Sequence, residues 1–206
     1  LFGLQTEFKL CHIPFLVAED VYGALALEGS SGTGKTTLVK RLGKLNEILS
    51  GGRVGIFSAD KARYEDFIGV PIPEVESGSM KIYPMPNSVA DMETVLIDEI
   101  NRATYDNQEK WLSLIATRQI DSISVKCKYL YTAMNPILSE SSDTYEGVQP
   151  LDKALGERMY ALITMPAFGK LDTKFRHDIM KASLEQVNWK PTEEVVRMHE
   201  SYIKQA

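Results

Sequence analysis

Five short apolar runs, separated by helical or polar segments, recur along the chain. They span residues 24–27, 54–57, 94–97, 129–134 and 160–165, and each has the length and composition of a buried strand. Strands that alternate with helices in this way form parallel sheets with both faces covered. The pattern therefore predicts an α/β fold with a parallel five-stranded sheet flanked by helices.

Apolar residues at helical spacing predict helices between these runs. The first helix carries Leu38, Leu42, Leu45 and Leu49 before two glycines end it, and a later one carries a stripe of Trp111, Leu114 and Ile115. Near the end of the chain, residues 191–194 have the composition of a helix start, with acidic residues in the first turn. One face of that helix would carry Val195, Met198, His199 and Tyr202.

The segment between the first strand and the first helix reads Gly-Ser-Ser-Gly-Thr-Gly-Lys-Thr and matches the phosphate-binding pattern GxxxxGK[ST] in full. Its glycines allow successive backbone N–H groups to face an anion, and the helix N-terminus adds partial positive charge. We expect Lys35 to reach the β- and γ-phosphates and the Thr36 hydroxyl to bind Mg²⁺. The flanking strand and helix argue against a chance glycine-rich turn. The predicted site for a nucleoside triphosphate, with ATP and Mg²⁺ as cofactors, comprises Gly29, Ser30, Ser31, Gly32, Thr33, Gly34, Lys35, Thr36 and Thr37.

The third apolar run ends in two adjacent carboxylates, Asp98 and Glu99. At the tip of a strand beside the phosphate loop, Asp98 would hold Mg²⁺ together with Thr36, usually through water. Glu99 would then act as the general base that polarises the attacking water. Taken alone, such a pair is more often a solvated strand end. After a complete phosphate loop, the catalytic interpretation is favoured.

Composition narrows the class of partner. The chain has 206 residues, and 28 Asp and Glu against 23 Lys and Arg give a net charge of −5. This balance argues against a surface built for nucleic-acid phosphates. Cys11 and Cys127 are too few and too far apart for a disulfide framework or a zinc site, so we expect buried, inert thiols of a reducing compartment. The three histidines are scattered singly, which argues against a metal site.

No apolar stretch approaches the ~20 residues of a membrane span, and no signal peptide is visible. We therefore expect a cytoplasmic protein with no membrane partner. Because the chain starts at Leu1 rather than at a methionine, we also expect a fragment, a processed product or an incomplete chain.

A series of short motifs resembles the AAA+ ATPases, and within them the MoxR-like branch, over roughly residues 20–168. The series starts with Asp-Glu-Ile-Asn-Arg-Ala at residues 98–103, continues with a strand that ends in Asn135-Pro136, and closes with a leucine-aspartate to arginine segment at residues 151–159. The order and spacing of these motifs make the match specific. The resemblance implies an AAA+ core over residues 1–166 and the beginning of a helical lid over residues 167–206.

The resemblance also implies roles for single residues. Asn135 matches the sensor-1 position, whose amide helps to orient the hydrolytic water, and Arg158 matches the arginine finger. Such a finger acts on the nucleotide of the neighbouring subunit, so identical subunits are expected to form a ring, with a hexamer favoured. Family members commonly have Asp-Arg-Phe where this chain has Glu157-Arg158-Met159. Arg102 matches an arginine near the subunit boundary and acts either across that boundary or in an internal salt bridge.

Other family features are less complete. Residues 66–73 and 78–86 match an insert within the second helix, which usually forms a hairpin that can contact substrate; a plain surface hairpin is the alternative. A lid normally carries a sensor-2 arginine that touches the γ-phosphate. Arg176 and Arg197 are candidates by residue type only, and surface positions are favoured for both. Contacts to the base are expected from irregular segments such as residues 10–17, which leaves the choice between ATP and GTP open.

Three functions are compatible with these motifs. The first is an ATP-driven enzyme of MoxR type that remodels, loads or activates a protein partner. The second is a nucleic-acid motor or a restriction-type subunit similar to McrB-like GTPases, although residues 122–128 offer that role only Lys126 and Lys128. The third is a nucleotide-dependent switch with little hydrolysis, against which Glu99, Asn135 and Arg158 argue. The favoured partner is a protein rather than a nucleic acid, gripped by the segment from Ile72 to Pro86.

Overall fold

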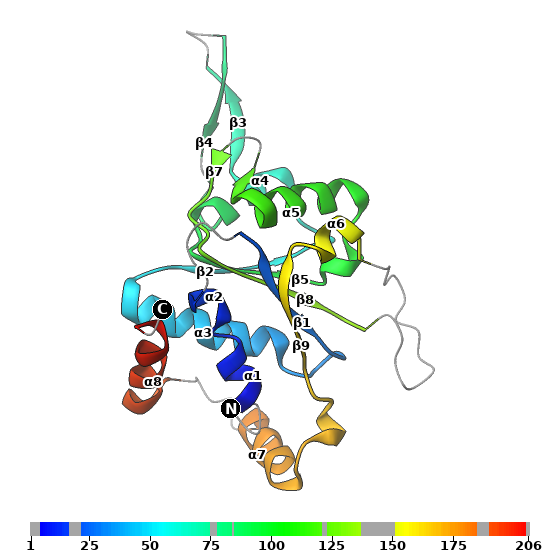
Figure 1. The fold of residues 1–206 in the computed structure, drawn as a ribbon. Coiled ribbons are helices and arrows are strands. Elements are labelled where there is room, and N and C mark those ends of the chain that lie inside the picture. The colour runs from blue at the N-terminus through cyan, green and yellow to red at the C-terminus, as the bar shows by residue number, and fades with distance from the viewer. Residues whose placement is uncertain are drawn as a thin grey trace.

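The computed structural model describes residues 5–16, 22–74, 78–83, 85–120, 123–136, 151–184 and 190–204. Its centre is a parallel sheet with the strand order β2-β5-β8-β1-β9 (Figure 1). The strands are β1 (Ala24–Glu28), β2 (Val54–Ser58), β5 (Thr94–Asp98), β8 (Tyr129–Met134) and β9 (Met159–Thr164). Each predicted run forms one strand, and the bounds differ by one residue at most. The predicted five-stranded sheet is confirmed.

Helices cover both faces of this sheet (Figure 1). On one face lie α4 (Tyr64–Phe67), α5 (Tyr105–Thr117) and α6 (Lys153–Gly156), and on the other lie α1 (Gln5–Leu10), α2 (Ile13–Leu16) and α3 (Lys35–Ser50). Side chains of one strand point to alternate faces. Val95 and Ile97 accordingly pack with the α5 side, whereas Leu96 packs with the α3 side. Burial on both faces explains why the strands read as unbroken apolar runs.

The two predicted helices present the expected apolar faces. Trp111, Leu114 and Ile115 of α5 are fully buried. In α3 the first three leucines of the pattern are buried, whereas Leu49 in the last turn is 37% exposed. Asn46 is buried near this end of the helix, where its amide Nδ2 donates a 2.9 Å hydrogen bond to Glu93 Oε2.

In the described residues two antiparallel hairpins interrupt the α/β pattern, and the larger is the predicted insert. The larger pairs β3 (Val70–Pro73) with β4 (Met80–Tyr83) and projects away from the body of the molecule (Figure 1). It lies between α4 and the short turn η1 (Val89–Asp91), so the expected insert separates two helical pieces that contact each other. The smaller hairpin pairs β6 (Gln119–Ile120) with β7 (Ile123–Ser124).

After β9 the chain continues through η3 (Phe168–Lys170), α7 (Thr173–Leu184) and α8 (Glu193–Ile203). The predicted helix start is confirmed, because Thr192 caps α8 by accepting a hydrogen bond from the N–H of Val195. Val195 and Met198 pack against the α3 side of the core, and His199 is fully buried. No helix in the described ranges is long and apolar enough to cross a membrane.

Two histidines that are distant in sequence meet between α2 and α8. His12 Nδ1 bonds the carbonyl of Phe8 at 2.8 Å, so this nitrogen carries the proton. His12 Nε2 then accepts from His199 Nδ1, also at 2.8 Å. Treating these histidines as isolated was wrong for this pair, because the fold brings residues 187 positions apart into contact.

Both cysteines are buried and free. Burial raises the pKa of the Cys11 thiol and of the Cys127 thiol to about 12. Since the thiolate is the reactive form, burial disfavours reaction at both sulfurs, and the expectation of buried thiols is confirmed.

Candidate nucleotide-binding site

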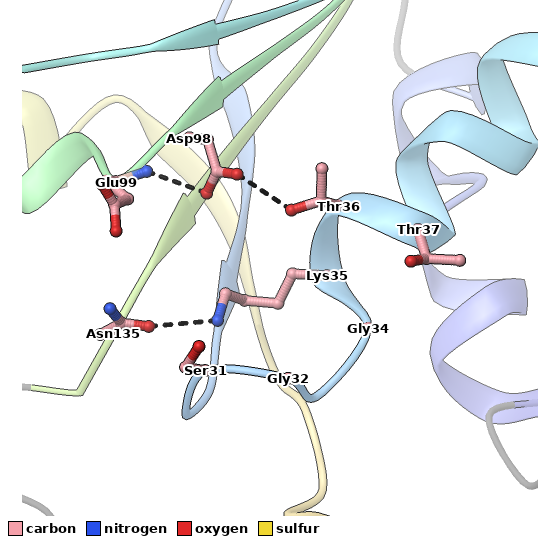
Figure 2. A pocket seen from close by; sticks show the side chains of 9 residues that line it. All are labelled: Ser31, Gly32, Gly34, Lys35, Thr36, Thr37, Asp98, Glu99 and Asn135. Carbon is pink, nitrogen blue, oxygen red and sulfur yellow. Dashed lines mark hydrogen bonds between the residues drawn. The ribbon is translucent and has the colours of Figure 1, made fainter. Parts of the chain in front are cut away.

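A pocket of about 250 Å³ opens at the carboxyl edge of the central sheet (Figure 2). It is formed by the loop after β1 and by the ends of β5 and β8, which are three neighbouring strands. Its lining comprises Ser31, Gly32, Gly34, Lys35, Thr36, Thr37, Asp98, Glu99 and Asn135. Every lining residue belongs to the set predicted from sequence. Of that set, Gly29, Ser30, Thr33 and Arg158 do not line the pocket.

The loop between β1 and α3 depends on glycine at two positions. Gly32 has a φ of 80° and Gly34, the N-cap of α3, has a φ of 88°. Residues other than glycine rarely adopt this left-handed backbone conformation. Thr33 closes the loop from inside, because its Oγ1 donates to the carbonyl of Ser30 at 2.9 Å. The loop residues that do not line the pocket thus shape it.

Lys35 lies in the first turn of α3 and is only 8% exposed. Its Nζ donates to the carbonyls of Gly29 at 2.6 Å and Ser30 at 3.1 Å, and to Asn135 Oδ1 at 3.2 Å. Burial lowers the pKa of Lys35, and Asp98 and Glu99 partly oppose that shift. The ammonium group therefore depends on two loop carbonyls and the Asn135 side chain for its solvation, and phosphate oxygens would replace them favourably.

Thr36 and Asp98 meet across the pocket. Thr36 Oγ1 donates a 2.9 Å hydrogen bond to Asp98 Oδ2. A hydroxyl and a carboxylate are oxygen donors of the kind that Mg²⁺ prefers, and here they lie beside the predicted phosphate site. The two predicted metal ligands therefore fit the ion.

Glu99 follows the last residue of β5 and has left-handed backbone angles, with φ 57° and ψ 41°. Its N–H donates to Asp98 Oδ1 at 3.0 Å, and its Oε1 pairs with Arg102 Nη1 at 3.1 Å. Of the two roles left open for Arg102, the single chain shows the internal salt bridge. An uncommon backbone conformation in a non-glycine residue is often found at functional positions.

Asn135 directly follows β8 and is held at two points. Lys35 binds its side-chain oxygen, and Asn101 Nδ2 donates to its backbone carbonyl at 2.8 Å. Asn101 lies in the turn η2 (Ile100–Arg102), and sequence analysis gave it no role. Its place in the Asp-Glu-Ile-Asn-Arg-Ala motif was the available signal. A hydrogen bond between residues 34 positions apart, however, cannot be predicted from a local sequence pattern.

Three arginines considered from sequence lie outside this pocket. Arg158 is exposed, and its Nη1 donates to the carbonyl of Ala154 at 3.0 Å. Arg197 is exposed on α8 and pairs with Glu193 at 3.4 Å, as expected of a surface residue. Arg176 is partly buried on α7, where its Nη2 donates to Thr173 Oγ1 at 3.0 Å.

Comparison with known proteins agrees with the fold and with this pocket. The sequence profile of the AAA domain (dynein-related subfamily) matches residues 24–159, which include every lining residue. No curated protein sequence matches the chain. The crystal structure of a candidate ATPase from Cytophaga hutchinsonii ATCC 33406 superimposes with a TM-score of 0.58 at 19% identity. The match covers 91% of this chain but 52% of that protein, so this chain spans about half its length. Because the family profile covers most of the chain, including the whole sheet up to the start of β9, the protein belongs to the dynein-related subfamily of AAA domains, with a P-loop AAA+ core.

Proposed function

We propose that the protein is an ATP-hydrolysing ring protein of MoxR type that remodels, loads or activates a protein partner. The observation that carries this proposal is the composition of the pocket. Lys35 and Thr36 at the start of α3, together with Asp98, Glu99 and Asn135 at the ends of β5 and β8, line one space of about 250 Å³. A phosphate-binding cation, a set of metal-binding oxygens, a general base and an orienting amide are the parts that phosphoryl transfer to water requires.

Binding would begin with an exchange of partners at Lys35. Its Nζ now contacts three oxygens of the protein. Phosphate oxygens would take over this cation, while the loop N–H groups and the N-terminus of α3 hold the rest of the triphosphate. Thr36 and Asp98 would hold Mg²⁺, which neutralises phosphate charge when it is bound.

Hydrolysis would use Glu99 and Asn135 on a water molecule in line with the γ-phosphate. Asn135 Oδ1 faces Lys35, so its Nδ2 points to the side of the pocket where Glu99 lies (Figure 2). This nitrogen can hold the oxygen of the water while a Glu99 oxygen takes its proton. The water oxygen then bonds to phosphorus as the bond to the β-phosphate oxygen breaks, which leaves ADP and phosphate. Arg102 keeps one Glu99 oxygen in place.

The position of Arg158 supports a ring of subunits. Arg158 lies outside the pocket of its own chain and is exposed, as a finger that serves a neighbouring subunit would be. A guanidinium brought in from outside would stabilise the charge of the transition state, with effects of about 10³–10⁵ in rate elsewhere.

A protein partner is supported by the two hairpins. On and beside the larger hairpin, Ile72, Met80, Tyr83 and Met85 are each more than 40% exposed, which suits an apolar contact. Next to the smaller one, Lys126 pairs with Asp91 at 2.8 Å and Lys128 pairs with Glu93 at 3.6 Å. Carboxylates of the same chain thus already balance both lysines, which leaves little charge for a nucleic-acid backbone.

The test of this function measures phosphate release from ATP and binding to single- and double-stranded DNA and RNA over a salt series. We expect Mg²⁺-dependent phosphate release and only weak nucleic-acid binding. Sub-micromolar nucleic-acid affinity that falls steeply with salt, together with ATPase stimulation by the same ligand, would instead support a nucleic-acid motor.

A further inference from the structure

The turn η2 connects the end of β5 to the end of β8 through one buried side chain. Asn101 in this turn is 2% exposed, and its Nδ2 donates a 2.8 Å hydrogen bond to the backbone carbonyl of Asn135. Glu99 is the N-cap of the same turn. Glu99 and Asn135, which would act on one water molecule, are therefore connected through the turn and the side chain of Asn101.

Two hydrogen bonds act on Asn135, one on its side chain and one on its backbone carbonyl. Its Oδ1 is drawn to Lys35 Nζ at 3.2 Å, which leaves Nδ2 on the opposite side, toward Glu99 (Figure 2). The backbone of residue 135 lies just beyond β8, whose last carbonyl, that of Met134, accepts from the N–H of Gly29 at 3.2 Å. At Asn135 itself, the bond from Asn101 holds the carbonyl and so the plane from which the side chain departs. Loss of that bond would let the amide rotate.

The side-chain oxygen of Asn101 shows that this residue does more than fill space in the core. Its Oδ1 is buried without a hydrogen-bond partner among the described residues. A buried, unpaired amide oxygen is unfavourable, and an apolar side chain of similar size would avoid it. What the apolar side chain would lack is the Nδ2 donor. Within the part of the chain that the structure describes, the bond to Asn135 is thus the interaction that distinguishes asparagine at this position.

We propose that Asn101 is a positioning residue, which sets the orientation of the Asn135 amide relative to Glu99 without touching the nucleotide itself. The proposal rests on the proposed ATPase function for its catalytic consequence, but the orientation of the amide is a property of the folded chain. Replacing residues that orient metal ligands typically changes activity by about 10- to 100-fold, and we expect an effect of that order for Asn101.

The experiment compares Asn101→Ala and Asn101→Leu with the wild type. Leu fills the space of the amide without a donor, so it separates lost packing from the lost hydrogen bond. Asn46→Ala is the matched control, because Asn46 is equally buried and its amide also donates a hydrogen bond, but to Glu93, which does not line the pocket. For each protein we would measure the thermal midpoint, the dissociation constant for ATP, kcat, and the NMR signal of the Asn135 side-chain amide, assigned by its absence in Asn135→Ala.

We expect both Asn101 variants to bind ATP with an unchanged dissociation constant, to lose about 10- to 100-fold in kcat, and to shift the Asn135 amide signal. Asn46→Ala should lose stability but retain kcat and the signal. In an Asn135→Ala background, Asn101→Ala should cause no further loss in kcat, because the group that it positions is gone.

Several results would overturn the proposal. These are an unmoved Asn135 signal, a full additional loss in the Asn135→Ala background, or two Asn101 variants that fail to fold while Asn46→Ala folds. An inactive wild type would contradict the proposed function alone, since a shifted signal in that protein would still support the role of Asn101.

Discussion

Thr36 Oγ1 and Asp98 Oδ2 are joined by a 2.9 Å hydrogen bond, although 62 residues separate them in sequence. The bond connects the first turn of α3 to the end of β5, and so connects the phosphate loop to the acidic pair. Both oxygens are the ones expected to face Mg²⁺. The apposition that metal binding requires is therefore present in the fold itself.

Replacing Thr36 by valine tests this relationship. Thr36→Val keeps the shape of the side chain but removes Oγ1, which donates the hydrogen bond to Asp98 and is expected to bind Mg²⁺. We expect a higher Mg²⁺ concentration for half-maximal hydrolysis and a fall in kcat of at least about tenfold. A Mg²⁺ titration of phosphate release checks this, with Thr117→Val, at an exposed position of α5 outside the pocket lining, as the control. An identical Mg²⁺ requirement in Thr36→Val would remove this hydroxyl from the metal site.

A shared active site predicts complementation between two inactive proteins. Arg158→Ala should bind ATP almost normally but hydrolyse it poorly, because the pocket of its own chain is intact. Mixing it with Glu99→Gln should restore part of the activity, since some interfaces in a mixed ring combine an intact Glu99 with an intact Arg158. Mixtures at several ratios would be assayed after subunit exchange has been verified. No recovery at any ratio would argue that Arg158 does not serve a neighbour.

The packing of α3 on the sheet gives a prediction about stability. A Cβ added at Gly43 would lie 2.5 Å from Val54 Cγ2 and 2.6 Å from Val54 Cβ. Alanine is the better helix former by about 1 kcal/mol, but overpacking typically costs about 1–3 kcal/mol. We expect Gly43→Ala to lower the free energy of unfolding in urea. Gly156→Ala is the control, because nothing lies within 4 Å of a Cβ there. A Gly43→Ala protein as stable as the wild type would show that α3 can move away from β2.

The buried histidine pair predicts a loss of stability in acid. Burial and the neighbouring His12 lower the pKa of His199 to about 4, below its ordinary value of 6.5. His199 is packed against Phe15 and His12, and His12 in turn against Phe8 and Tyr202. Between about pH 6.5 and pH 4 the unfolded chain takes up a proton that the folded chain does not, so the free energy of unfolding falls as the pH falls.

For His199 alone, the loss at pH 5 is on the order of 2 kcal/mol. Urea unfolding of the wild type at pH 7 and pH 5 would measure the total, and His199→Phe should show a smaller difference between the two pH values. His177→Asn, an exposed change on α7, should retain the wild-type difference. An equal pH dependence in His199→Phe and the wild type would contradict this assignment.

The features that the sequence predicted depend on residues close together along the chain, whereas those it missed depend on contacts between distant segments. The strands, the turn of Gly32 and Gly34 and the start of α8 depend on neighbouring residues, so local patterns predicted them. The acidic pair could be assigned because parallel strands end at the same edge of a sheet. The bond from Asn101 to Asn135 and the contact between His12 and His199 depend on how distant segments meet. Sequence patterns along one chain carry no signal for such contacts.

The central claim is that the pocket binds ATP through Lys35 and hydrolyses it through Glu99. Nucleotide titration and phosphate release measured together on Lys35→Ala and Glu99→Gln test this claim most directly. We predict that Lys35→Ala loses tight ATP binding, because no other pocket cation replaces Nζ among the described lining residues, whereas Glu99→Gln binds ATP normally and loses turnover. Unchanged turnover in Glu99→Gln, or unchanged ATP affinity in Lys35→Ala, would contradict it.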